Sequence, residues 1–133
     1  MRLVLDTNSV LQSIAHWSRY HDLWLSILDG RNQLCVTTEI LNEYAEIIER
    51  KTNAQFSSLA IEVIINNPNT LFINTFYNFN LIQQDPDDNK FVDCAVAAGA
   101  KFIVSNDHHY DILKDIVFPR IEVIPIEKMM KFL

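Results

Sequence analysis

Residues 85–107 read DPDDNKFVDCAVAAGAKFIVSND and combine an acidic helix start, an alanine-rich helix, a short apolar segment and a further acid. Asp85 is placed to cap the helix, and the acids that follow it lie near the positive end of the helix dipole. Gly99 is suited to close the helix. The apolar segment at 101–105 predicts a short buried strand, and Asp107 comes just beyond it.

Two acids of this helix are expected to face in opposite directions. At about 100° per residue, Asp88 falls in the apolar stripe of the helix and is expected to point inward. The stripe consists of Phe91, Val92, Ala95 and Val96. Asp93 falls on the opposite side with Lys90, where a carboxylate is solvated at little cost. An inward carboxylate is costly unless a cation or strong hydrogen bonds compensate it, so Asp88 requires a partner.

Apolar segments alternate with amphipathic helices along the rest of the chain. Besides 101–105, strands are expected at 2–5, 33–36, 70–73 and 121–124. Helices are expected from about residue 10 and at 20–28, 39–51, 55–66, 110–114 and 127–132. Residues 7–9 and then Thr37 or Thr38 are candidate helix caps. Residues 74–84 lack a clean period and are expected to form a mostly extended connection.

This alternation predicts a parallel sheet covered by helices on both faces, a three-layer α/β/α fold with about five strands. Ligands of such sheets bind beyond the carboxyl ends of the strands. Asp6 and Asp107 follow two of these strands, and Asp88 lies in the first turn of a helix that starts near the same edge. Glu43 lies near the start of the helix at 39–51 and is the glutamate of that helix that borders its buried side. Four acids that are distant in sequence are thus expected to converge.

Composition limits the class of protein. A chain of 133 residues with 49% hydrophobic content predicts one domain, spanning 1–133. The net charge of −6 and the pI near 5.0 argue against binding nucleic acid mainly through a basic face. A nucleic-acid enzyme remains compatible, because bound divalent cations offset a concentrated acidic site. Cys35 and Cys94 are expected to be buried and reduced.

The chain carries no signal for secretion or membrane insertion that we can recognise. Its N-terminus, MRLVLD, is charged, and no apolar run approaches the roughly 18 to 20 residues of a membrane span. We therefore expect a cytoplasmic protein without a membrane partner. Carboxylates that gather without matching Lys or Arg form a site for Mg²⁺ or Mn²⁺, which prefer oxygen ligands. Such ions activate water and stabilise charge on a phosphodiester, so the expected chemistry is metal-dependent phosphodiester hydrolysis.

The chain resembles the PIN-domain ribonucleases over essentially its full length. LVLDTNSVL at 3–11 resembles the opening strand of that family with its first acid, and TTEILNEYAEIIER at 37–50 resembles the helix with its glutamate. Residues 85–107 resemble the segments with the third and fourth acids. The resemblance implies that the catalytic and metal-binding residues are Asp6, Glu43, Asp88 and Asp107.

The subgroup that the chain resembles is the VapC-like toxins of bacterial toxin–antitoxin pairs. This implies an RNA substrate, a cognate antitoxin, a homodimer and the strand order 3-2-1-4-5. Asn8, Asp93 and Ser105 are candidates for residues that support the metal ligands, with Asp93 peripheral. Where the family often has an acid, two residues after the fourth acid, this chain has His109. His109 and the neighbouring His108 are candidate contacts for substrate or metal.

Two other classes of function compete with the nuclease. One is a catalytically silent module of the same fold that binds RNA or a protein partner and retains its acids for structure, since each acid singly can be explained as a cap or a solvated charge. The other is a phosphoacceptor signalling domain, which also has an aspartate at a strand end. That class is ranked lowest because it requires a lysine at the end of a late strand, and Lys128 lies beyond the predicted strand at 121–124.

Overall fold

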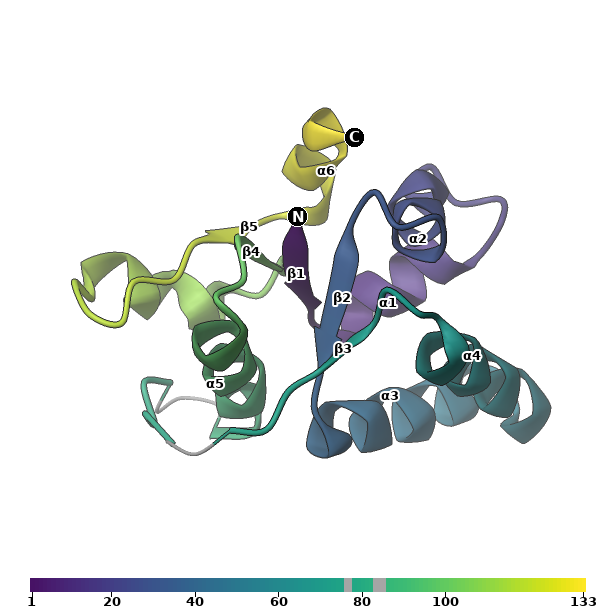
Figure 1. Cartoon of the computed structure of the whole chain (residues 1–133), viewed down its shortest axis with the longest axis horizontal. Coiled ribbons are helices and arrows are strands. Elements are labelled where there is room, and N and C mark those ends of the chain that lie inside the picture. The colour runs from purple at the N-terminus through teal and green to yellow at the C-terminus, as the bar shows by residue number, and fades with distance from the viewer. Residues whose placement is uncertain (76–77, 83–85) are drawn as a thin grey trace.

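Five parallel strands form the central sheet of the computed structural model, which describes residues 1–75, 78–82 and 86–133 (Figure 1). The strands are β1 (Arg2–Leu5), β2 (Gln33–Val36), β3 (Leu71–Phe72), β4 (Phe102–Val104) and β5 (Val123–Ile124). Their order is β3-β2-β1-β4-β5, and every neighbouring pair is parallel. The predicted sheet and its strand order are confirmed, although the two edge strands are shorter than expected.

Helices flank this sheet in the predicted α/β/α arrangement. They are α1 (Thr7–Ile14), α2 (His21–Leu28), α3 (Thr38–Lys51), α4 (Ala54–Asn66), α5 (Asn89–Ala98) and α6 (Ile126–Met129), with 3₁₀ helices η1 (Pro86–Asp88), η2 (His108–Asp115) and η3 (Met130–Phe132). Helix α5 packs on β1, β2 and β4, whereas α1 contacts β1, α2 and α3. In Figure 1, α3 and α4 lie side by side at the end of the molecule opposite η2.

Local sequence explains where the helices begin and end. Thr37 caps α3, because its hydroxyl accepts a hydrogen bond from the Ile40 amide at 3.2 Å. Gly99 ends α5 with φ of 62°, a left-handed conformation that favours glycine. The cap of α1 differs from the prediction: it is Asp6, not a residue of 7–9. The predicted cap at Asp85 lies outside the described residues, and α5 is preceded by the 3₁₀ turn η1.

The connection between β3 and α5 packs against α5. Its described parts, 74–75 and 78–82, contain neither helix nor strand. The Asn89 side chain donates to the Ile82 carbonyl and accepts from the Ile82 amide, both at 2.9 Å. The Phe79 amide donates to the Asp93 carboxylate at 3.1 Å. The expectation that Asp93 is solvated is therefore wrong: the residue is 6% exposed, because the connection covers that side of α5.

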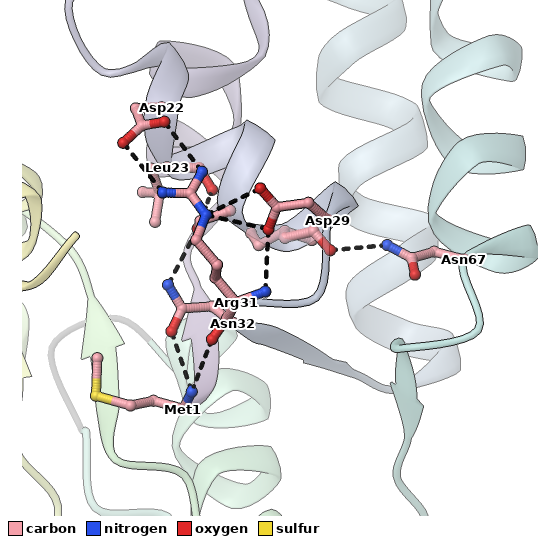
Figure 2. Close-up of polar contacts among 9 residues, drawn as sticks. Met1, Asp22, Leu23, Asp29, Arg31, Asn32 and Asn67 are labelled. Carbon is pink, nitrogen blue, oxygen red and sulfur yellow. Dashed lines mark hydrogen bonds and ion pairs between the residues drawn. The ribbon is translucent and has the colours of Figure 1, made fainter.

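A polar network fixes the start of β1 and β2 (Figure 2). The Arg31 guanidinium pairs with Asp22 at 3.0 Å and with Asp29 at 2.9 Å. The amino group of Met1 donates to the Asn32 side chain at 3.1 Å and to the Arg31 carbonyl at 3.2 Å. These contacts hold the N-terminus against the turn that precedes β2, far along the sheet from the carboxyl ends of the strands. Among the described helices, none is both long and apolar enough to cross a membrane.

Candidate functional site

Asp6 lies at the carboxyl end of β1 and is buried. One carboxylate oxygen accepts a hydrogen bond from the Ser9 amide at 2.8 Å, and this contact caps the start of α1. The other oxygen accepts a hydrogen bond from the Ser105 hydroxyl. Burial raises the pKa of Asp6 and the charge of Asp107 adds to this, while the hydrogen bonds from Ser105 and Ser9 act in the opposite direction. In the metal-free protein, the hydrogen bonds of Asp6 therefore offset only part of the cost of burying its negative charge.

Ser105 connects the ends of β1 and β4. Its hydroxyl donates to Asp6 and accepts the Asp107 amide at 3.0 Å. Because β1 and β4 are parallel neighbours, their carboxyl ends meet at one edge of the sheet, as the sequence predicted. The supporting role of Ser105 stays a prediction, and these two hydrogen bonds are the contacts through which it would act.

Asp88, Asp107 and His109 form a compact cluster at this edge. One ligand atom of each residue lies within 4.8 Å of the ligand atoms of the other two. The His109 Nδ1 atom lies 3.1 Å from Asp107 Oδ1 and 3.6 Å from Asp88 Oδ2. The His109 amide also donates to Asp107 Oδ1 at 2.8 Å. Asp107 therefore caps η2 and fixes the backbone of His109. Asp88 belongs to η1 and the other two residues to the β4–η2 segment.

Glu43 reaches the site from α3 but is held by different partners. Its carboxylate accepts a hydrogen bond from the Thr7 hydroxyl. Its other oxygen lies 2.7 Å from the Lys90 ammonium. The expectation of acids without a matching cation is thus wrong at Glu43. The error arises because angular counting assigns Lys90 to the solvated side of its helix. Thr7 had been considered only as a helix cap.

Tyr110 follows His109 in η2 and is buried. Its side chain is 1% exposed, and its hydroxyl has no hydrogen-bond partner among the described residues. Burial raises the pKa of Tyr110, and negative charge on four acids raises it further. These acids are Asp88, Asp6, Asp107 and Glu43. The charges of the four predicted acids thus act on one buried hydroxyl. Sequence reasoning missed Tyr110 because its ring reads as ordinary packing.

Comparison with known proteins assigns the sequence to a family. The sequence model of the PIN domain matches residues 2–109, which is most of the chain. The chain belongs to the PIN-domain family. PIN domains are generally nucleases that use divalent metal ions. A comparison with curated protein sequences found no match.

Solved structures with a similar fold include three from bacteria. VapBC2 from Rickettsia felis bound to a promoter DNA fragment has a TM-score of 0.65 and 17% identity, covering 94% of this PIN domain and 98% of that chain. VapBC-1 from nontypeable Haemophilus influenzae has a TM-score of 0.61 and 15% identity, covering 96% and 99%. DNA-bound VapBC from Salmonella typhimurium has a TM-score of 0.60 and 15% identity, covering 95% and 98%. At these identities the likeness establishes the fold.

The remaining candidate residues of the PIN domain lie at different distances from the acids. Asn8 is exposed and lines a hollow of about 200 Å³ together with Asp6 and Asp107. His108 is 94% exposed and its ring contacts Asp111 at 3.2 Å, so it points away from the cluster that His109 joins. Asp93 lines a separate polar cavity of about 630 Å³ on the side of α5 covered by the connection. Burial raises its pKa, against which the Phe79 amide acts.

The donor set at the sheet edge fits a divalent metal ion. Two carboxylates and an imidazole nitrogen lie close together, and such groups are the common protein ligands of divalent ions. The buried Tyr110 hydroxyl adds a polar group that lacks a partner among the described residues, as expected next to a site that binds something. Asp6 is linked to this set through Ser105, whereas Glu43 lies outside it and contacts Thr7 and Lys90.

Proposed function

We propose that this PIN domain is a divalent-metal-dependent endoribonuclease that hydrolyses RNA phosphodiester bonds and acts as the toxin of a toxin–antitoxin pair. The observation that supports the proposal is the cluster of Asp88, Asp107 and His109, together with the hydrogen bonds by which Ser105 links Asp6 to Asp107. These three acids come from separate segments of the chain. Capping explains the position of Asp6 or Asp107 singly, but it gives no reason for Asp107 to lie beside Asp88 and His109.

In this proposal the acids have different tasks. Asp88 and Asp107 would hold Mg²⁺ or Mn²⁺. Asp6 extends the negative field from β1, and Ser105 fixes it relative to Asp107. The bound ion supplies an activated water and stabilises charge on the phosphodiester. Glu43 borders the site and is oriented by Thr7 and Lys90.

Lys90 gives this acidic protein a cation at the site. Its ammonium contacts Glu43 and also donates to the Asp87 carbonyl at 2.7 Å. It lines both the polar cavity beside α5 and the hollow next to Glu43. A cation in this position attracts the phosphate backbone while the surrounding acids hold the metal ion. This arrangement lets a protein with a net charge of −6 approach RNA without a basic face.

RNA cleavage tests the enzymatic part of the proposal. A structured RNA pool is incubated with the wild type in Mn²⁺, Mg²⁺ or EDTA, and with Asp6→Asn and Asp88→Asn. Metal-dependent cleavage is expected from the wild type, falling by at least about 100-fold in both variants, the upper end of the loss for residues that support metal ligands. Matched controls are Glu49→Gln and Asp115→Asn, exposed acids of α3 and η2 that should retain full activity.

Two outcomes would contradict the nuclease. Cleavage that persists in Asp6→Asn and in EDTA would point to a contaminating enzyme. Absence of cleavage by the wild type, together with absence of metal binding, would favour the catalytically silent module that binds RNA or protein. Metal binding is measured directly by calorimetry, so these outcomes do not depend on guessing the RNA sequence.

The partner is proposed from the structural likeness to VapBC complexes, which are toxin–antitoxin pairs. We expect a homodimer and a small antitoxin that inhibits it. Light scattering coupled to gel filtration measures the oligomeric state of the purified chain. Growth arrest on induction that is lost in Asp6→Asn and relieved by the protein encoded next to this gene would support the toxin role. Growth unaffected by active wild-type enzyme would oppose it.

A further inference from the structure

His109 occupies an unusual position for a surface histidine of a short helix. It is 40% exposed as a side chain, yet its Nδ1 atom faces the two carboxylates of Asp88 and Asp107. The backbone of the same residue is fixed, because its amide donates to Asp107 at 2.8 Å. The imidazole nitrogen is therefore presented to the cluster by a rigid turn rather than by a free side chain.

The neighbouring histidine provides an internal comparison. His108 precedes it in η2, is 94% exposed and contacts Asp111 instead of the acid cluster. The two side chains have the same chemistry and sit one residue apart in the same turn. Their different positions mean that the direction of the η2 backbone selects His109 for the site.

A second observation indicates that this cluster binds something. The hydroxyl of Tyr110, the next residue, is buried and lacks a hydrogen-bond partner among the described residues. Burial raises the pKa of this hydroxyl most, and the negative charges of the four acids raise it further. A buried hydroxyl without a partner carries a free-energy cost, which a ligand or a metal-bound water at the cluster would remove.

The type of donor determines which ion this site prefers. Mg²⁺ demands oxygen ligands and near-ideal octahedral geometry, whereas imidazole suits transition-metal ions. Affinity of a site with nitrogen donors rises from Mn²⁺ through later members of the first transition series. An acid in place of His109 would give an all-oxygen cluster. The imidazole therefore shifts the preference of the site away from Mg²⁺.

We propose that His109 Nδ1 is a metal ligand and that, with Asp88 and Asp107, it makes this site selective for Mn²⁺ and other transition-metal ions over Mg²⁺. This inference rests on the metal site of the proposed function and assigns a nitrogen donor to it. It predicts that the purified chain binds Mn²⁺ more tightly than Mg²⁺, and that His109 accounts for most of the difference.

Metal binding by the whole chain tests this assignment without reference to RNA cleavage. Calorimetry with Mn²⁺ and with Mg²⁺ compares the wild type with His109→Ala, His109→Asp and the matched control His108→Ala. In His109→Ala we expect Mn²⁺ affinity to fall by on the order of tenfold or more. In His109→Asp we expect Mg²⁺ affinity to rise, so that the ratio of Mn²⁺ affinity to Mg²⁺ affinity becomes smaller. His108→Ala should match the wild type for both ions.

Spectroscopy of bound Mn²⁺ provides a direct readout of the donor. Electron spin-echo measurements should detect coupling to the ¹⁴N nucleus of an imidazole in the wild type and in His108→Ala, and should lose it in His109→Ala. Circular dichroism and thermal unfolding of His109→Ala and the wild type, both in EDTA, show whether the substitution has altered the folded structure. Coupling that persists in His109→Ala would overturn the proposal.

The sign of the affinity change separates the proposal from the alternative that His109 is only a counter-charge for the two carboxylates. Removing a counter-charge would strengthen binding of both ions, whereas removing a ligand weakens binding of Mn²⁺ selectively. Equal or stronger binding in His109→Ala would therefore overturn the inference while leaving the nuclease intact. Failure of the proposed function itself looks different, because neither ion would bind and Asp88→Asn would have no effect.

Discussion

The Lys90 ammonium lies 2.7 Å from a carboxylate oxygen of Glu43, so a cation pairs with one of the four acids at the candidate site. The pair joins α5 to α3, and both side chains are partly buried, at 15% and 26% exposed. Lys90 also donates to the Asp87 carbonyl of η1. The contact therefore fixes Glu43 and, through the backbone of η1, the segment that carries Asp88.

Replacing Lys90 tests this relationship. In Lys90→Gln we expect the free energy of unfolding to fall by about 1 kcal/mol, the upper end for a partly solvated ion pair. We also expect Mn²⁺ to bind more tightly, because the lysine charge no longer opposes the ion. Chemical denaturation in EDTA and calorimetry measure the two effects.

The control is Arg50→Gln, which removes the Arg50–Glu46 pair of 2.9 Å from the exposed side of the same helix α3. That pair is solvated, and its loss should change stability by less than about 0.5 kcal/mol and leave metal affinity unchanged. Equal effects of the two substitutions would mean that the Lys90–Glu43 contact is an ordinary surface pair.

The Asp6→Asn variant is expected to gain stability while losing function. Burial raises the pKa of Asp6 above its ordinary value, so the folded state favours the protonated form and ionisation at neutral pH costs stability. Asparagine keeps the cap, since its carbonyl oxygen accepts the Ser9 amide. The metal-free variant should therefore unfold at a higher temperature than the wild type at pH 7, and the difference should shrink as the pH falls towards 4.

A carboxylate with the opposite shift provides the control for this pH dependence. The Arg31 amide and guanidinium hold the pKa of Asp29 below its ordinary value. Asp29→Asn should therefore lower the unfolding temperature at pH 7 and approach the wild type as the pH falls. Thermal unfolding in EDTA across this pH range checks both signs. A lower stability of Asp6→Asn at pH 7 would show that the Asp6 charge is compensated by the protein itself.

The fold followed from sequence because its signals are local. Strands such as β1 and β2 read as short apolar runs, and caps such as Thr37 act on amides of the same helix. The proximity of Asp6 and Asp107 followed from topology, since a parallel sheet brings the ends of β1 and β4 together. Figure 1 shows the central position of β1 on which this depends.

The errors concern contacts between segments that are distant in sequence. Helix counting assigns Asp93 and Lys90 to a solvated side, but the connection after β3 covers Asp93 and α3 supplies Glu43 to Lys90. A helical wheel describes one helix and cannot show which other segment packs on it. Tyr110 was missed for the same reason, because the burial of its hydroxyl and the charges that act on it depend on segments distant in sequence.

The burial of Asp93 leads to a further expectation for stability. Burial raises its pKa, so its ionised form is unfavourable in the folded protein and stability is lost as the pH rises. An asparagine at this position still accepts the Phe79 amide. Asp93→Asn should therefore be more stable than the wild type at pH 7, and this difference in stability should be smaller near pH 4. Its cleavage activity should equal that of the wild type. A loss of cleavage in this variant would place Asp93 in the catalytic site after all.

Removing the Tyr110 hydroxyl should separate the metal-free state from the metal-loaded state. In EDTA the hydroxyl is buried without a partner among the described residues, so Tyr110→Phe should raise the free energy of unfolding by about 1 kcal/mol. If the hydroxyl donates to the loaded site, the same variant should show a smaller stabilisation by Mn²⁺ than the wild type.

Tyr44→Phe is the matched control, because the equally buried hydroxyl of Tyr44 donates to the Leu5 carbonyl at 2.5 Å. That substitution should lower stability by about 1 kcal/mol and leave the stabilisation by Mn²⁺ unchanged. Denaturation of both variants with EDTA and with Mn²⁺ decides the matter, and a destabilised Tyr110→Phe in EDTA would mean that the hydroxyl already has a partner in the metal-free protein.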